Sequence, residues 1–425
     1  MVNRYYPLPA TDPLHRLSVR DGFIVNAERW ELAHHYHRHR QNIHYQSLNE
    51  PGIVKGLGVH ISEAPKEWSA KFQKQGHCLE IHSGIAIDIE GNPIVVNESI
   101  KFPFKRPDMS GTEDGEEIIV YLVVSYVDNR KLTDEEYWKV DEEPWKEREW
   151  FRFDQQINPP TPRQIELCRI KLLVKDVEVG TFELKNPEDV LYPKLNEIDL
   201  RFRPQAQARP QALVNIATTT PISDNQFFQN TNKNLGCLMQ SLNVLYPSLQ
   251  GNIEVKNNIL EQPLHLNNVD LVYIPSWQIR NLYASRREAL EEHLKRGGVI
   301  LIEAQIQPEN NSDSILEEIY INVEKLFGIT NDSWQNWYDL SQEYPFKNKP
   351  FLFTALPLLN QIENISYSKG IVVVLGNLSS AWGGKDEEDR DLPRNDIRTA
   401  QELGINILYF AYKRRNMMSL LSANT

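Results

Sequence analysis

The sequence predicts two units of different fold class: an α+β unit with a long helix and an antiparallel sheet, then an α/β unit with a doubly wound sheet. Three observations carry this prediction. Residues 1–200 combine one long helical segment with short runs of alternating apolar residues. In residues 211–425, apolar strands alternate with helical segments, as in a mostly parallel sheet. Between them, residues 201–210 are rich in Pro, Gln and Arg without apolar periodicity, which indicates a linker.

The first unit should open with a helix at residues 27–48. Asn26 is a good N-cap, and no Gly or Pro interrupts the segment before the turn residues that follow it. Strands are expected at residues 53–59, 79–82, 118–127 and 165–174.

A β-hairpin is expected at residues 85–96, where two apolar runs flank Glu90-Gly91-Asn92-Pro93. Gly91 can take the positive φ that such a turn requires. Hairpin edges and turns are surfaces that a neighbouring subunit can cover, so Asp88 and Gly91 are candidate interface residues.

Residues 131–162 form an excursion rich in acidic and aromatic side chains, and a Pro-rich stretch closes it. One interpretation is a solvated loop whose tryptophans pack against the core. The other is a contact arm for a neighbouring subunit, since Trp and Tyr are enriched at interfaces. On the second interpretation Trp145 and Trp150 are candidate interface residues.

The second unit should alternate strands and helices. Ser285 is the expected N-cap of one helix, and Gly297-Gly298 ends it. Strands are expected at residues 212–217, 269–274, 299–302 and 371–375, and helices at residues 232–245, 285–296, 312–327 and 395–412.

Five histidines crowd the first helix: His34, His35, His37, His39 and His44. His35 and His39 are four residues apart and share a face, but a zinc site needs three or four converging ligands. No HExxH or CxxC pattern is present. We therefore expect no metal and no cofactor, with His34 and His37 packed or hydrogen-bonded as neutral side chains.

Composition excludes several protein classes. A net charge of −12 argues against a general nucleic-acid binder, which would present a basic face. Three widely spaced cysteines favour free thiols in a reducing compartment. The N-terminus lacks an apolar signal core, and no apolar run is long enough to span a bilayer. We expect a cytoplasmic protein.

The motifs of residues 21–97, taken in order, resemble a small module of phage-tail-like particles, the extracellular contractile injection systems. They are Asp21-Gly22-Phe23-Ile24-Val25-Asn26, Tyr36-His37-Arg38, Gly52-Ile53-Val54-Lys55-Gly56-Leu57-Gly58-Val59 and Ser83-Gly84-Ile85-Ala86-Ile87-Asp88-Ile89-Glu90-Gly91-Asn92-Pro93-Ile94-Val95-Val96. The resemblance implies a structural, baseplate-associated or accessory subunit that stands in a rotationally symmetric ring with other subunits of the particle.

The second unit resembles a bacterial domain family of unknown function with a class I glutamine amidotransferase-like (flavodoxin-like) fold. The resemblance rests on residues 269–275, on residues 290–304 with their Gly297-Gly298, and on Ala381-Trp382-Gly383 with residues 402–407.

An amidotransferase needs a Cys nucleophile at a strand-to-helix turn and a His that activates it. The turn after Ile302 offers Glu303 and no Cys, and Cys237 falls within a helical segment. His293 lies among charged residues, as on a solvated helix face. We therefore expect no enzymatic activity.

Two other functions stay open. One is a hydrolase or amidotransferase-like enzyme whose active residues the sequence does not reveal, and replacement of Ser276, Glu303 or His293 is its test. The other is a carbohydrate- or ligand-binding module with a groove lined by Trp334, Trp337, Tyr338 and Trp382, the last also a candidate interface residue. The acidic run at residues 386–389 indicates a solvated loop rather than a cation site.

Overall fold

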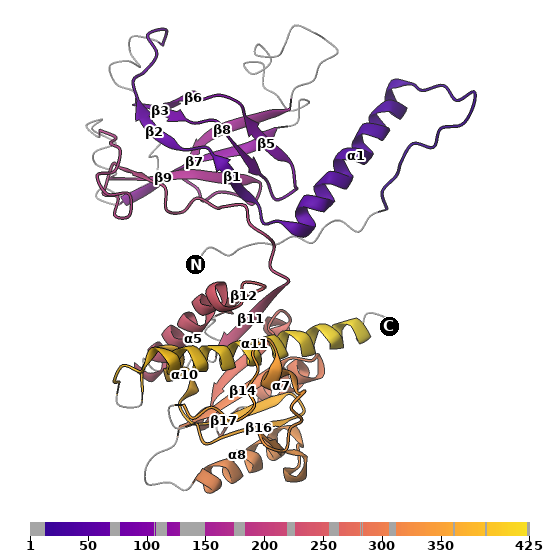
Figure 1. Cartoon of the computed structure of the whole chain (residues 1–425), viewed down its shortest axis with the longest axis vertical. Helices are drawn as coiled ribbons and strands as arrows, with labels where there is room; N and C mark the ends of the chain where they lie inside the picture. Colours follow the sequence, from indigo (N-terminus) through magenta and orange to yellow (C-terminus); the bar gives the residue numbers. More distant parts are fainter. Residues whose placement is uncertain are drawn as a thin grey trace. The chain divides into compact units, whose positions relative to one another are not determined.

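The computed structural model describes residues 13–68, 77–105, 107, 117–127, 149–173, 183–218, 226–254, 263–280, 282, 284–305, 312–359, 362–386 and 389–422. The chain divides into two compact units, Met1–Arg209 and Pro210–Thr425. Figure 1 shows the helices and the several sheets that make this a mixed α/β protein. Within the described residues, no helix is long and apolar enough to cross a membrane.

Unit 1 (Met1–Arg209) contains the long helix α1 (Ala27–Leu48) and three antiparallel sheets. The sheets have the strand orders β1-β4-β5, β2-β3-β6 and β10-β9-β7-β8. The strands are β1 (Gly52–Gly56), β2 (Val59–Ser62), β3 (His77–Ile81), β4 (Gly84–Ile87), β5 (Pro93–Val96), β6 (Ile100–Phe104), β7 (Glu117–Val127), β8 (Trp150–Gln156), β9 (Gln164–Leu173) and β10 (Ile198–Asp199). Apolar side chains from all three sheets, such as Ile53, Leu79 and Leu122, share one core.

Helix α1 and the hairpin form where the sequence predicts them. The side chain of Asn26 caps α1 by accepting a hydrogen bond from Arg29 N (3.0 Å). β4 pairs antiparallel with β5, and Gly91 between them has a φ of +80°. The single strand predicted at residues 53–59 is instead two strands, β1 and β2, because Gly56 and Leu57 have positive φ and turn the chain.

The segment predicted as a linker, residues 201–210, is almost entirely part of unit 1. Ala206 N donates to Ile53 O (2.9 Å), and Arg209 N donates to Leu48 O (2.7 Å). An extended segment can pair through its backbone without any apolar periodicity, because each peptide group carries its own donor and acceptor. The prediction of a free linker was wrong for this reason.

Unit 2 (Pro210–Thr425) is built on a seven-stranded mixed sheet with the order β12-β11-β13-β14-β17-β16-β15. The first five strands run parallel, and the last two join antiparallel. The strands are β11 (Ala212–Thr218), β12 (Leu249–Glu254), β13 (Leu271–Pro275), β14 (Val299–Ala304), β15 (Gln335–Asn336), β16 (Asn364–Ser368) and β17 (Ile371–Leu375). The helices are α5 (Gln226–Leu245), η2 (Pro263–Leu266), α6 (Ser276–Ile279), α7 (Ala284–Lys295), α8 (Ser312–Phe327), η3 (Asn331–Ser333), α9 (Pro345–Asn348), α10 (Leu378–Trp382) and α11 (Arg394–Ser422).

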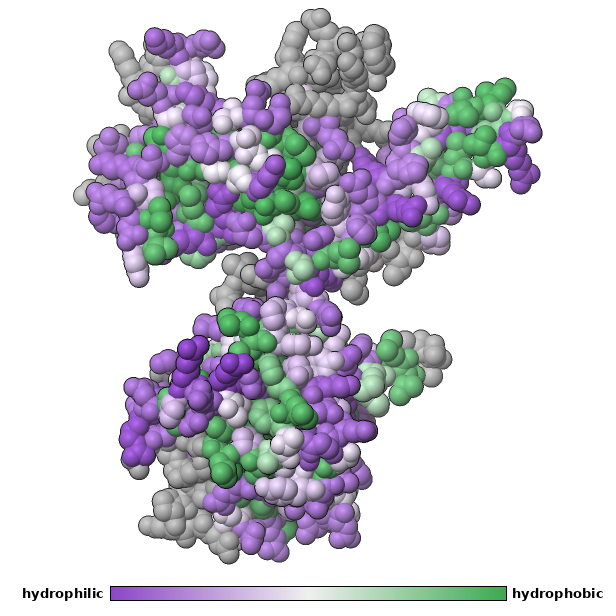
Figure 2. Space-filling view, in the orientation of Figure 1, coloured by the Kyte–Doolittle hydropathy of each residue, from purple (hydrophilic) through white to green (hydrophobic). Residues whose placement is uncertain are grey.

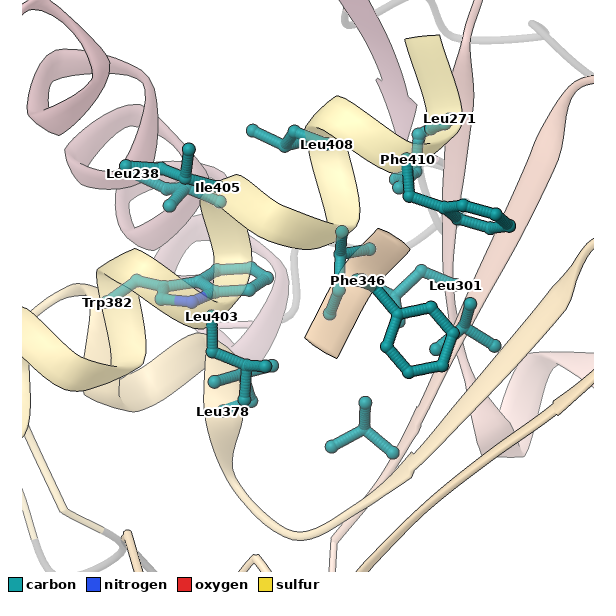
Figure 3. Close-up of a cluster of buried hydrophobic side chains, with 14 of the residues drawn as sticks. Leu238, Leu271, Leu301, Phe346, Leu378, Trp382, Leu403, Ile405, Leu408 and Phe410 are labelled. Atoms are coloured by element: carbon teal, nitrogen blue, oxygen red, sulfur yellow. The ribbon is translucent and has the colours of Figure 1, made fainter. Parts of the chain in front are cut away.

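Successive residues of the central strands face two different cores, one on each side of the sheet. On β14, Val299 and Leu301 join the cluster covered by α5, α9, α10 and α11, which Figure 3 shows in part. Ile300 and Ile302 join the cluster under α7 and α8. A strand buried on both faces must be apolar throughout, and all five residues of β17 are buried.

Two helix ends differ from the prediction. Helix α7 begins at Ala284, so Ser285 lies inside its first turn rather than at the N-cap. Helix α11 continues to Ser422, ten residues beyond the predicted end at residue 412. Its extension is held by arginines that reach back to the sheet: Arg414 Nη1 donates to Gly298 O (2.6 Å), and Arg415 Nη1 donates to Asp270 Oδ1 (3.1 Å).

Candidate functional site

Helix α1 has no buried residue along its 22 residues. Trp30 is 59% exposed, and Ile24 in the arm that precedes the helix is 78% exposed. Figure 2 shows apolar surface at the tip that this arm forms with the start of α1. Helices in folded proteins gain most of their stability from packing an apolar face. An exposed helix with aromatic and aliphatic side chains is therefore typical of a surface that another protein covers.

A cleft of about 650 Å³ lies between α1, the β4–β5 hairpin and the β7–β8 pair. Its basic lining residues are His15, His35, Arg38, His39, Arg152 and Arg163. Its two carboxylates are Asp88 and Glu90, and Glu90 is ion-paired with Arg163 (2.6 Å). We call this concave surface the α1 cleft. Basic side chains outnumber carboxylates in its lining, although the net charge of the whole chain is negative.

Asp88 holds the hairpin turn together and against α1. Its carboxylate accepts hydrogen bonds from Glu90 N (2.9 Å), Asn92 N (2.8 Å) and Asn92 Nδ2 (3.0 Å). The side-chain amides of Asn92 and Asn42 then hydrogen-bond to each other (2.9 Å), which links the turn to α1. Burial raises the pKa of Asp88, and its hydrogen bonds oppose that rise. Asp88 is 5% exposed, so it is a positioning residue of the turn rather than the open contact surface that the sequence suggested.

Gly91 also faces α1 and not solvent. A Cβ at this position would lie 2.6 Å from the backbone oxygen of Asn42. The turn therefore needs glycine for two reasons, the positive φ and the close approach of α1.

We expect Gly91→Ala to lower the free energy of unfolding of unit 1 by about 2–5 kcal/mol, from left-handed strain of about 1–2 kcal/mol plus overpacking of about 1–3 kcal/mol. Gly22→Ala is the matched control, because Gly22 has a φ of +81° but a Cβ there would have no atom within 4 Å. Urea unfolding of both variants measures the difference. Equal losses in the two variants would show that the turn does not press on α1.

The predicted tryptophan sites do not come together. Trp145 lies outside the described residues. Trp150 is half-buried on β8, where it pairs with Val127. Trp382 is 2% exposed, and its Nε1 donates to Ala400 O (3.0 Å) inside the core. It therefore presents no contact surface on unit 2.

The groove of four aromatic residues that the ligand-binding alternative requires is not formed either. Trp337 is 0% exposed and lies in the same core cluster as Trp382, whereas Tyr338 is 76% exposed. Trp334 stacks on Tyr320 with ring centroids 4.4 Å apart. Large aromatic side chains contribute most when they are buried, and here the core takes two of the four.

The histidines of α1 do not converge as metal ligands would. The rings of His35 and His39 lie edge to face with centroids 6.4 Å apart. Within the described ranges, no group of three His, Cys, Asp or Glu side chains is placed to hold a metal ion. The absence of a metal therefore stays a prediction, and elemental analysis of untagged protein tests it.

Glu303 occupies the carboxyl end of β14, the edge at which α/β sheets place their active sites. Its carboxylate accepts hydrogen bonds from Ser379 N (2.7 Å) and from the hydroxyl of Tyr273. Burial raises the pKa of Glu303 and that of Tyr273. The hydrogen bond between Tyr273 and Glu303 gives each of these buried polar groups a partner. Cys237 lies elsewhere, on α5.

His293 was predicted on a solvated helix face, and that prediction was wrong. The side chain is 3% exposed, and its Nε2 lies 3.2 Å from Val299 O. Ala289 and Leu290, four and three residues earlier on α7, are also buried. This i, i+3, i+4 spacing was the available signal, but the charged neighbours of His293 masked it. Burial lowers its pKa to about 4.

No protein-family model matches this chain. No curated protein matches it either. Among solved structures it is similar to a putative ThuA-like protein from Bacteroides uniformis, with 10% sequence identity and a TM-score of 0.26. The match covers 48% of this chain and 91% of that one.

Proposed function

We propose that the chain is a structural, baseplate-associated or accessory subunit of a contractile injection system, and that unit 1 docks it to the particle. One observation carries the assembly role: α1 has 22 residues and buries none of them. Exposed Trp30 and the apolar arm before α1 are the kind of surface that a neighbouring subunit covers. The order of motifs in residues 21–97 supports the assignment to a phage-tail-like particle.

We infer further that unit 2 has the amidotransferase-like, flavodoxin-like fold without catalytic activity. Numbered along the chain, its strand order begins 2-1-3-4, as in flavodoxin-like sheets. Glu303 stands where an amidotransferase would have its nucleophile. Its carboxylate accepts hydrogen bonds from the Tyr273 hydroxyl and from Ser379 N. Turnover of an ester, an amide or glutamine that disappears on replacing Ser276, Glu303 or His293 would support the enzyme alternative.

The docking role is tested by expressing Met1–Arg209 and Pro210–Thr425 separately in cells that lack the full chain. The boundary follows the end of unit 1, so that the segment paired with α1 and β1 stays in the first fragment. We expect the first fragment to co-purify with the particle and the second to be lost. Retention of the second fragment alone would assign docking to unit 2.

The same proposal includes repeated copies of the chain around a symmetric particle, as closed rings require. Trp145 and Trp150 stay proposed contacts between copies. Within the assembly the partners are protein subunits, and nucleic acid is not among them, since the net charge of the chain is −12.

A further inference from the structure

We propose that the α1 cleft binds the acidic, aromatic segment 132–145 of a second copy of this chain. The inference rests on the proposed assembly role of unit 1 and names the partner that its surface receives.

The cleft offers an acidic peptide the side chains that recognise one. Three arginines and three histidines line it against two carboxylates. Glu90 and Arg163 pair with each other, and Asp88 accepts hydrogen bonds within its own hairpin, so Arg38 and Arg152 give the rest of the lining its positive charge. Aromatic and aliphatic residues, among them Tyr36 and Leu32, complete the lining. A volume of about 650 Å³ lies within the range of clefts that proteins use for ligands.

The segment has the complementary composition. Residues 132–145 contain six carboxylates and a single lysine, with Tyr137, Trp138 and Trp145 among them. Carboxylates suit arginine, and Trp and Tyr supply the apolar anchors that dominate most interfaces. Residues 113–117 and 386–389 are also strongly acidic, but neither run contains an aromatic residue.

The chain that carries the segment is long enough to reach a neighbour. It leaves β7 after Val127 and re-enters β8 at Trp150, which leaves 22 residues between the two strands. An out-and-back excursion of that length extends up to about 35 Å, at about 3.3 Å per residue. A segment that inserts into the next copy makes a head-to-tail or reciprocal contact, as symmetric assemblies need.

Sedimentation of the pure full-length chain tests the proposal without the particle. We expect concentration-dependent association that weakens as salt is added, because exposed charge pairs are screened. Arg38→Glu should weaken association about tenfold or more, since like charges face each other across the contact. Arg40→Glu is the matched control: the charge change is the same and lies on the same helix, but Arg40 lines a separate shallow surface. If Arg38→Glu disturbs folding, Arg38→Gln replaces it and should give a smaller loss of the same kind.

A mixing experiment separates a second copy from the chain's own segment. The Arg38→Glu variant keeps its segment, and a variant with Glu135, Glu136, Glu142 and Glu143 changed to Gln keeps its cleft. Each should be monomeric alone, and the mixture should form heterodimers that do not grow. A mixture that stays monomeric, a wild-type chain that never associates, or equal effects at Arg38 and Arg40 would overturn the proposal. Co-purification with the particle alongside any of these results would leave the proposed function standing.

Discussion

Replacing Trp382 by alanine is expected to lower the free energy of unfolding of unit 2 by about 3–5 kcal/mol, the usual cost of removing a buried tryptophan. Trp382 is 2% exposed and contacts helix α11 from α10. The substitution also leaves Ala400 O without the indole N–H that donates to it (3.0 Å). Gly404 lies so close to the indole that a Cβ there would be 2.7 Å from Nε1. Because this glycine has no side chain, it cannot fill the cavity that the substitution leaves.

Trp277→Ala is the control for this loss, because Trp277 belongs to the same unit and is 45% exposed. It should cost less than about 1 kcal/mol, in keeping with substitutions at exposed positions. Urea unfolding followed by hydrogen exchange in peptides from β14 and β17 reports on unit 2 alone. A loss for Trp382→Ala no larger than that of the control would mean that Trp382 is a surface residue, as the ligand-binding hypothesis required.

The second large effect is a pH dependence that comes from His293. Burial lowers its pKa from an ordinary 6.5 to about 4, and the nearby Arg414 and Arg415 add to the shift. Between these values the unfolded chain binds a proton that the folded chain does not. The contribution of His293 to the free energy of unfolding is therefore fully present above about pH 6.5. It falls as the pH drops through this window and is lost near pH 4. The loss integrates to about 3 kcal/mol, at about 1.4 kcal/mol per pKa unit.

Comparing the wild-type chain with His293→Gln isolates this contribution. Glutamine can still donate to Val299 O but does not titrate. Burial raises the pKa of Asp270 and of Glu303, which gives a pH dependence of the opposite sign, but both carboxyls are present in both proteins. Urea unfolding at several pH values should show a shallower slope for the variant between pH 4 and 6.5. Parallel curves across that window would rule out a buried neutral His293.

The sequence predicted correctly those elements whose bounds are set by neighbouring residues in the chain. Helix α1 begins and ends as predicted because Asn26 caps it and Pro51-Gly52 cannot continue it. Strand β17 was predicted with its exact bounds, since a strand buried on both faces is apolar at every position.

Long-range contacts were beyond the reach of such signals. Arg414 and Arg415 extend α11 because of carbonyls and a carboxylate more than a hundred residues earlier in the chain. The α1 cleft is likewise made by side chains from α1, the hairpin and β8, which no single sequence pattern connects.

The segment that ends unit 1 defines a path for mechanical load. Any pull on Pro210 reaches Arg209 first, and Arg209 is bonded to the last turn of α1 through Leu48 O. The next bonds, Glu50 N to Gln207 O (2.8 Å) and Ala206 N to Ile53 O (2.9 Å), pass the force to the start of β1. A pull on unit 2 would therefore load the junction between the end of α1 and the start of β1 before it reached the core of unit 1.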